Sequence, residues 1–331
     1  MNASSVHISR RYHLGEEIGR GTLGVVYRAF DRLTGQTVAL KRLLIEPIRA
    51  LTTTPGSDPK LALAREFRVL ASLRHPHVIS VLDYGFDAQQ VPYYTMDLLE
   101  NAQTIVAYGQ SLGLERKVEL LIELLQALTY LHRRGILHRD LKPANVLVID
   151  DHVKVVDFEL ALVREQFRPE NQTLVGTLEY MPPEVLQNEP PTERSDLYAV
   201  GVIAFELLAG RHPYDTSSLN RLLTDVLLMT PNWSLLPHVD RLGTFLATLL
   251  AKSPAERYSN AVEAIEALAE AIGRDAPPET VAIRESFLQA ATFVGRKTEY
   301  EQLATALRHG LNADTGSAWL VGGESGVGKS R

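Results

Sequence analysis

The stretch His138-Arg139-Asp140-Leu141-Lys142-Pro143-Ala144-Asn145 could do chemistry. It places a carboxylate, an ammonium group and an amide close together, and a further aspartate, Asp157, follows it. Phosphoryl transfer asks a protein mainly for positioning and charge stabilisation, which are tasks for groups of these kinds. The alternative is an ordinary loop with two solvated charges and an asparagine turn. The elements that flank the stretch decide between these interpretations.

A buried helix is predicted to precede the stretch and a hairpin to follow it. Leucines recur before it at three- and four-residue spacing: Leu120, Leu121, Leu124, Leu125, Leu128 and Leu131. Gly135 is well placed to end that helix. After the stretch, 146–148 and 153–156 are typical of short strands joined by a turn at Asp150-Asp151. Such a hairpin would carry Asp157 to a position facing Asp140.

The stretch resembles the catalytic loop of the eukaryotic-type (Hanks-type) protein kinases. A lysine at the position of Lys142 resembles the serine/threonine class of these kinases. The resemblance implies that Asp140 accepts the proton of the substrate hydroxyl. It implies that Lys142 lies over the transferred phosphate as a point charge. Asn145 and Asp157 would hold magnesium.

A glycine pattern near the start is shared by two folds. Its members are Gly19, Gly21 and Gly24. A dinucleotide-binding fold needs a helix to start there. Residues 25–30 are instead typical of a strand, and a turn at Thr34-Gly35 leads to another strand that contains Lys41. This order resembles the glycine-rich loop and Val-Ala-Ile-Lys motif of the kinases, so we favour that interpretation over dinucleotide binding.

The resemblance implies an ATP site in a cleft between two lobes. Lys41 would hold the α- and β-phosphates, and the glycines would let the loop backbone approach phosphate oxygens. Val26 and Ala39 would pack on adenine. Met96 would close the back of the pocket, although a plain core position is equally compatible with it. The other residues assigned to ATP by resemblance are Ile18, Asp97, Leu99 and Leu147.

A long connection, residues 43–60, has turn chemistry at 52–57 and is predicted as a loop. Glu66 follows it and precedes a His75-Pro76 pair, which resembles the regulatory helix of the kinases and its downstream landmark. The resemblance implies that Glu66 pairs with Lys41. The alternative is an exposed surface glutamate.

Asp157-Phe158-Glu159 stands where the kinases have Asp-Phe-Gly. Glycine tolerates backbone angles that a residue with a Cβ resists. We expect activity to survive Glu159 and the switching of this segment to be altered.

Residues 160–181 would form the activation segment. Thr173 is the candidate acceptor of a regulatory phosphate that Arg139 would bind, and the alternative is an ordinary loop threonine. Thr177 resembles the threonine that helps to define the Ser/Thr acceptor site. The resemblance also implies two structural contacts: Glu184 with Arg257, and Asp196 with the backbone of the catalytic loop. Helical patterns at 219–228, 242–251 and 261–272 complete a mostly helical second lobe.

Composition narrows the classes of protein. The 331 residues carry a net charge of −6, with 22% charged and 45% hydrophobic residues, which is ordinary for a globular protein. The net charge is negative, so no overall basic charge favours binding of nucleic acid. The sequence contains no cysteine, which excludes disulfides and thiolate metal sites. Without a signal peptide or a stretch long enough for a membrane span, we expect a cytoplasmic protein with no membrane partner.

The end of the chain carries another motif. A break at 275–279 predicts a linker over 273–290, after a kinase domain at 12–272 and an N-terminal tail at 1–11. Residues 293–297 resemble the opening of an AAA or signal-transducing (STAND) ATPase module. Gly323 to Ser330 fits the P-loop pattern G-x-x-x-x-G-K-S. We interpret 291–331 as the truncated start of a P-loop ATPase domain, in an order that resembles bacterial signalling proteins.

The expected fold is α+β and bilobal, with a β-rich first lobe and a helical second lobe. The expected function is transfer of the γ-phosphoryl group from Mg-ATP to a protein serine or threonine. A transient dimer for autophosphorylation is a further implied partner state. The alternative is a pseudokinase that binds ATP and regulates a downstream ATPase domain; only Glu159 supports it.

Overall fold

The structure is a computed structural model that describes residues 11–21, 24–44, 67, 69–157, 178–236 and 239–278, with positions 280, 281, 283, 284, 286, 302 and 305 beyond them. The chain divides into two compact units, Met1–Ser286 and Phe287–Arg331. All helices and strands named below belong to the first unit. Several predictions concern residues outside the described ranges: Glu66, Phe158, Glu159, Thr173, Thr177 and the P-loop octet 323–330.

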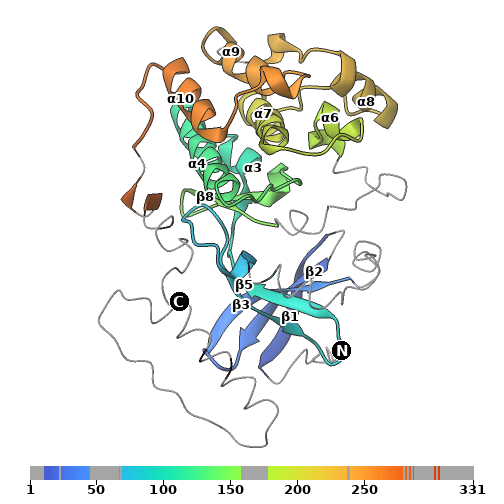
Figure 1. Ribbon diagram of the computed structural model, residues 1–331, viewed down its shortest axis with the longest axis vertical. Coiled ribbons are helices and arrows are strands. Elements are labelled where there is room, and N and C mark those ends of the chain that lie inside the picture. The colour runs from blue at the N-terminus through green and yellow to red at the C-terminus, as the bar shows by residue number, and fades with distance from the viewer. Residues whose placement is uncertain are drawn as a thin grey trace, which may run out of the picture. The chain divides into compact units, whose positions relative to one another are not determined.

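The first five strands form an antiparallel sheet in the order β1-β2-β3-β5-β4 (Figure 1). Their bounds are Tyr12–Arg20, Gly24–Asp31, Gln36–Leu43, Val81–Phe86 and Pro92–Met96 for β1 to β5. The predicted strands around the glycine pattern are thus confirmed. Ile79, two residues before β4, bonds outside this sheet, because its N–H donates to the carbonyl of Val155 at 3.0 Å.

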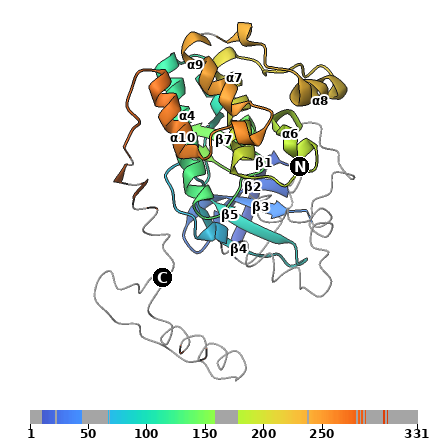
Figure 2. The ribbon, with the colours of Figure 1, turned by 45° about the horizontal axis from the view of Figure 1, so that its top comes forward.

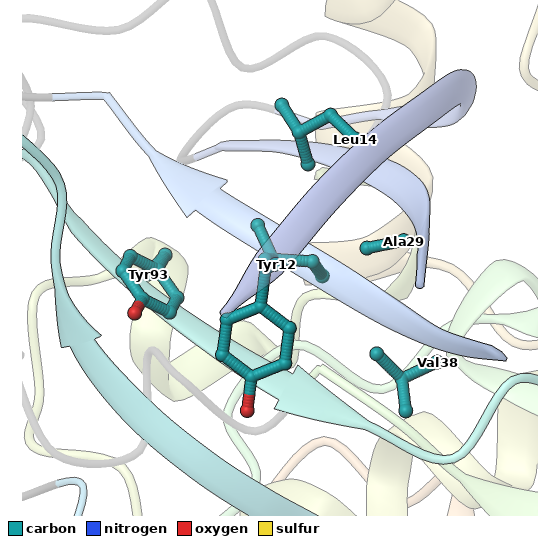
Figure 3. Packing of buried hydrophobic residues seen from close by; sticks show 6 residues of the cluster. Tyr12, Leu14, Ala29, Val38 and Tyr93 are labelled. Carbon is teal, nitrogen blue, oxygen red and sulfur yellow. The ribbon is translucent and has the colours of Figure 1, made fainter. Parts of the chain in front are cut away.

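One face of this sheet carries a compact apolar cluster (Figure 3). Its buried members are Tyr12, Leu14, Ala29, Val38, Leu40 and Tyr93. The rings of Tyr12 and Tyr93 meet edge to face with centroids 5.8 Å apart, a favoured aromatic geometry. Alternation along the strands leaves the other face for the residues discussed below.

The second region of the unit is helical. Its longest members are α4, Leu114–His132, and α7, Glu193–Ala209, and Figures 1 and 2 show α10 beside α4. The predicted leucine stripe of α4 is completely buried. Gly210 ends α7 in the left-handed conformation at φ 72°, which glycine adopts without a Cβ clash. The remaining helices are α3 Ile105–Gly109, α6 Pro183–Leu186, α8 Leu219–Leu228, α9 Val239–Leu249 and α10 Ala261–Ala271.

The predicted hairpin after the catalytic stretch is confirmed. β7, Val146–Ile149, pairs with β8, His152–Val155, and β6, Gln103–Thr104, lies on the other side of β7. Asp150 and Asp151 form the turn at φ 48° and 66°, the left-handed angles that a two-residue hairpin turn requires. Among the described residues, no helix has the length and apolar character to cross a membrane.

Candidate active site

Asp196, in the first turn of α7, accepts hydrogen bonds from the backbone of the stretch 138–145. Its Oδ2 accepts from the backbone N–H of His138 at 2.8 Å, and its Oδ1 accepts from that of Arg139 at 2.9 Å. The imidazole of His132, at the end of α4, bonds the same carboxylate at 2.8 Å. Burial alone would raise the pKa of Asp196, but these bonds lower it overall. The predicted anchor is confirmed, whereas the contribution of His132 was not predicted.

His138 connects the stretch to the segment that carries Asp157. Its ring is fully buried, and its Nε2 lies 3.0 Å from the carbonyl oxygen of Val156. Its Nδ1 faces the N–H of Asp140 at 3.3 Å. A tautomer with the proton on Nε2 satisfies both contacts, because Nε2 then donates and Nδ1 accepts. The N–H of Val156 also donates to the carbonyl of Asn145 at 3.0 Å, so two bonds join the segments.

Asp140, Lys142 and Asn145 form one hydrogen-bonded group. Oδ2 of Asp140 accepts from Lys142 Nζ at 2.9 Å and from Asn145 Nδ2 at 3.0 Å. Asn145 Nδ2 also donates to the backbone carbonyl of Asp140 at 2.7 Å. Oδ1 of Asp140 is buried and has no hydrogen-bond partner among the described residues. One oxygen is therefore fixed in place and the other is left to accept a proton.

Lys41 and Asp157 meet across the two regions. Their Nζ and Oδ1 atoms lie 2.8 Å apart, with 5% and 32% of the side chains exposed. Asp157 has a left-handed backbone at φ 62°, an angle that aspartate tolerates better than most residues. The predicted partner of Lys41, Glu66, lies outside the described residues. The contact with Asp157 was not predicted, because the two residues are 116 positions apart and no local sequence pattern relates them.

The three glycines are not equivalent. A Cβ on Gly24 would lie 2.8 Å from the carbonyl oxygen of Arg42 and 3.3 Å from Cε of Lys41, so the close approach of β2 and β3 requires glycine there. A Cβ on Gly19 or Gly21 would meet its nearest described neighbour only at 3.9 Å. Packing within the described chain therefore gives no reason for these two glycines.

Strand register brings the predicted adenine contacts to the sheet face of Lys41. Val26 lies opposite Lys41, and Ala39 lies opposite Met96. Paired residues share a face, as do residues two apart along a strand, so all four side chains project from the same face. Ala39 and Met96 are buried, whereas Ile18 on β1 is 43% exposed. The N–H of Asp97 donates to the carbonyl of Ser80, Leu99 follows half-buried, and Leu147 lies half-buried on β7.

A pocket opens beside Asp140, on the side of the segment that leads into α6. Its lining includes Arg139, Asp140, Tyr180, Met181, Pro182 and Val185. Nε of Arg139 is buried without a hydrogen-bond partner among the described residues. The pocket therefore joins the carboxylate of Asp140 to apolar wall residues.

A buried ion pair contacts Ser195, which lines that pocket. Arg257 makes two bonds of 2.8 Å to the carboxylate of Glu184, and Ser195 adds a third at 2.8 Å. Burial alone would raise the pKa of Glu184, but the hydrogen bonds and charge of Arg257 lower it overall. The predicted pair is confirmed, and the hydroxyl of Ser195 is an additional partner that was not predicted.

Comparison with known proteins identifies the family of the chain. Residues 12–270 match the protein kinase domain family. A probable serine/threonine-protein kinase of Streptomyces coelicolor is 38% identical over 213 residues, which cover 62% of this chain and 31% of that protein. The serine/threonine-protein kinase PknB of Mycolicibacterium smegmatis is 32% identical over 272 residues, 78% of this chain and 42% of PknB. The chain thus spans less than half the length of these relatives.

A solved structure shares the fold. The crystal structure of the Mycobacterium tuberculosis PknI kinase domain superposes with a TM-score of 0.61 at 26% identity, over 82% of this chain and 99% of that one. The fold described above, with its sheet and its helical region, is thus shared with that kinase domain over most of the length of this chain. The chain belongs to the protein kinase domain family.

Proposed function

We propose that this chain transfers the γ-phosphoryl group of ATP to a serine or threonine hydroxyl of a protein. The observation that carries the proposal is the carboxylate of Asp140. Lys142 and Asn145 hold one oxygen, and the other is buried and unpartnered. A carboxylate in this state can accept the hydroxyl proton while the hydroxyl oxygen bonds to phosphorus and ADP departs.

The pocket beside Asp140 supports a protein as the acceptor. A peptide would pass over its walls of Tyr180, Met181 and Pro182 without inserting a side chain, because the volume of the pocket is only about 30 Å³. Lys142 would neutralise charge on the transferred group. Its ammonium already lies against Asp140, so a phosphate placed there would find both residues together.

The nucleotide would lie against the sheet face of Lys41. Val26, Ala39 and Met96 provide its apolar wall, with Ile18, Leu99, Asp97 and Leu147 around the edge. Gly19 and Gly21, which packing within the described chain does not require to be glycine, would let backbone N–H groups approach the phosphates. Lys41 would contact the α- and β-phosphates, and Glu66 would orient its ammonium.

Magnesium suits the oxygen atoms at the site. Asp157 has one carboxylate oxygen beyond the one that Lys41 contacts, and Asn145 uses its amide nitrogen on Asp140, which leaves the amide oxygen to accept. Mg²⁺ prefers oxygen ligands and is commonly held by one or two protein groups together with substrate phosphates. Bound there, it would neutralise charge on the phosphates.

Regulation would act through Arg139. Its buried Nε has no hydrogen-bond partner among the described residues, and a phosphate on Thr173 would bring strong acceptors. Thr177 would help to select the acceptor hydroxyl, and a transient dimer would allow phosphorylation between copies. We also propose that 291–331 begins a P-loop ATPase domain and that the protein is cytoplasmic.

The direct test is incubation of the whole chain with radiolabelled ATP, magnesium and a generic protein substrate, followed by mapping of labelled residues. Label on serine or threonine with the native chain, but not with Asp140→Asn, supports the proposal. If neither protein transfers label although both bind ATP in a thermal-shift assay, the chain is a nucleotide-binding module and not a kinase.

A further inference from the structure

A protein substrate would pass over Tyr180, Met181 and Pro182, which line the pocket beside Asp140. We call residues 178–182 the wall segment. The wall segment contains a single helical turn. One turn is too short to be stable by itself, so contacts from other elements must fix the wall segment in place.

Tyr180 attaches the wall segment to α7 through its side chain. Its hydroxyl donates to Oε2 of Glu206 at 2.8 Å. Burial, followed by the charge of Glu206, raises the pKa of Tyr180, so the hydroxyl keeps its proton and remains a donor. This contact fixes one side chain of the wall segment but not its backbone.

His212, in the loop after α7, attaches the backbone of the wall segment. Its Nε2 lies 2.9 Å from the carbonyl oxygen of Glu179, and because a carbonyl only accepts, Nε2 must carry a proton. Its Nδ1 lies 3.2 Å from both the backbone nitrogen and the carbonyl oxygen of Tyr214. A neutral ring accepts from the nitrogen and a charged ring donates to the oxygen, so the bond to Glu179 persists in either state.

The chain around His212 restricts where its ring can lie. Gly210 ends α7 at φ 72°, and Pro213 limits the backbone angles of the residue before it. Tyr214, which bonds Nδ1, is itself buried. The ring of His212 also meets the ring of Tyr180 edge to face, with centroids 5.8 Å apart. His212 therefore contacts both the backbone and a side chain of the wall segment.

We propose that His212 is a positioning residue for the protein substrate: it fixes the wall segment at Glu179 and thereby sets the surface over which the substrate passes. Asp140 is held separately, because Asp196 accepts from two backbone N–H groups of the catalytic stretch. Loss of the His212 contact should therefore weaken substrate binding and leave the chemical step nearly unchanged. This kinetic consequence deepens the proposed function and rests on it, whereas the contact itself does not.

The kinetic test compares the native whole chain with His212→Phe and His212→Gln, on a peptide built around the serine or threonine that the native chain labels. Phenylalanine keeps a ring against Tyr180 but cannot donate, so the KM for the peptide should rise about fivefold, the scale of one hydrogen bond. kcat and the KM for ATP should stay close to the native values, because loss of uniform binding changes KM alone. Glutamine retains an N–H donor, so His212→Gln should recover most of the native KM.

Arg211→Gln is the matched control, because Arg211 is an exposed neighbour in the same loop. It should leave kcat and both KM values unchanged. An unchanged peptide KM in His212→Phe, or a fall in kcat as large as the rise in KM, overturns the proposal. Equal peptide KM values for His212→Phe and His212→Gln also overturn it, since the donated N–H would then not be responsible.

Amide exchange, measured by nuclear magnetic resonance, tests the contact without catalysis. The N–H of Met181 donates to the carbonyl of Leu178 at 3.2 Å and closes the turn of the wall segment. In His212→Phe this N–H should exchange faster than in the native chain, whereas that of His138, held by Asp196, should not. If the native chain transfers no phosphate, the proposed function fails and this exchange still decides whether His212 fixes the wall segment. Equal exchange of Met181 in the two proteins overturns the proposal.

Discussion

The helical region holds Asp140 through side chains that are almost completely buried, whereas the sheet holds Lys41 through strand register and an ion pair that solvent reaches. Asp196 and Glu184 are 2% and 4% exposed, and both accept several hydrogen bonds. By contrast, both side chains of the pair between Arg28 on β2 and Glu100 are more than a third exposed. Removing one partner of a buried charge pair is costly and removing an exposed pair is not, so the buried pairs of the helical region should contribute to folding and the exposed pair of the sheet should not.

The largest expected effect tests this contrast in stability. Arg257→Met leaves Glu184 as an uncompensated buried charge and should lower the free energy of unfolding by about 3–5 kcal/mol. Arg28→Met, the matched change in the sheet, removes only exposed contacts and should leave stability unchanged. Urea denaturation followed by circular dichroism measures both. Equal losses in the two variants would show that burial does not separate the regions.

A change in the reacting group should leave folding intact. Asp140→Asn keeps the shape of the side chain but not its basicity, and should lower the phosphoryl-transfer rate at least a hundredfold, roughly 3 kcal/mol. The melting temperature should stay close to that of the native chain. A loss below tenfold in the rate would contradict the proton-accepting role of Asp140.

Two glycines of the sheet distinguish a packing requirement from a ligand requirement. Gly24→Ala places a Cβ 2.8 Å from a backbone oxygen and should cost roughly 1–3 kcal/mol of stability, as overpacking does. Gly19→Ala meets no close neighbour among the described residues and should leave the melting temperature unchanged while weakening ATP binding. Thermal melts with and without ATP separate the two effects. A stability loss for Gly19→Ala equal to that of Gly24→Ala would remove the argument that a ligand explains Gly19.

Sequence patterns predicted the elements well because each pattern is local. Leucine spacing predicted α4, and two short strand-like runs around a two-aspartate turn predicted the β7–β8 hairpin. The resemblance also predicted two long-range contacts: that of Asp196 with the backbone of the catalytic stretch, and that of Glu184 with Arg257. The contacts of His132, Ser195 and Asp157 with their partners were missed, because each joins residues from different elements and nothing in the local sequence marks a buried acceptor. His132 in particular looks like an ordinary residue at the end of a helix until α7 is placed beside it.

The smallest expected effect concerns the junction between the regions. Burial, followed by the nearby charges of His77 and Lys154, lowers the pKa of His75 to about 3, and its ring stacks on Tyr130 of α4 at 4.9 Å. The folded state keeps this ring neutral, whereas the unfolded chain takes up a proton below about pH 6.5. Stability should therefore be complete above that pH and fall as the pH decreases, by about 1 kcal/mol at pH 5.5 for this residue.

His75→Phe keeps a ring against Tyr130 but cannot titrate, so the loss of stability between pH 7.5 and 5.5 should be smaller in this variant than in the native chain. The difference between the two pH values is the relevant quantity, because the substitution also removes the acceptor for the N–H of His77 and lowers stability at every pH. His77 is buried with its pKa lowered as well, so part of the pH dependence should persist. Identical pH dependence in the two proteins would show that His75 is protonated as readily in the folded chain as in the unfolded one, and that the junction is open to water.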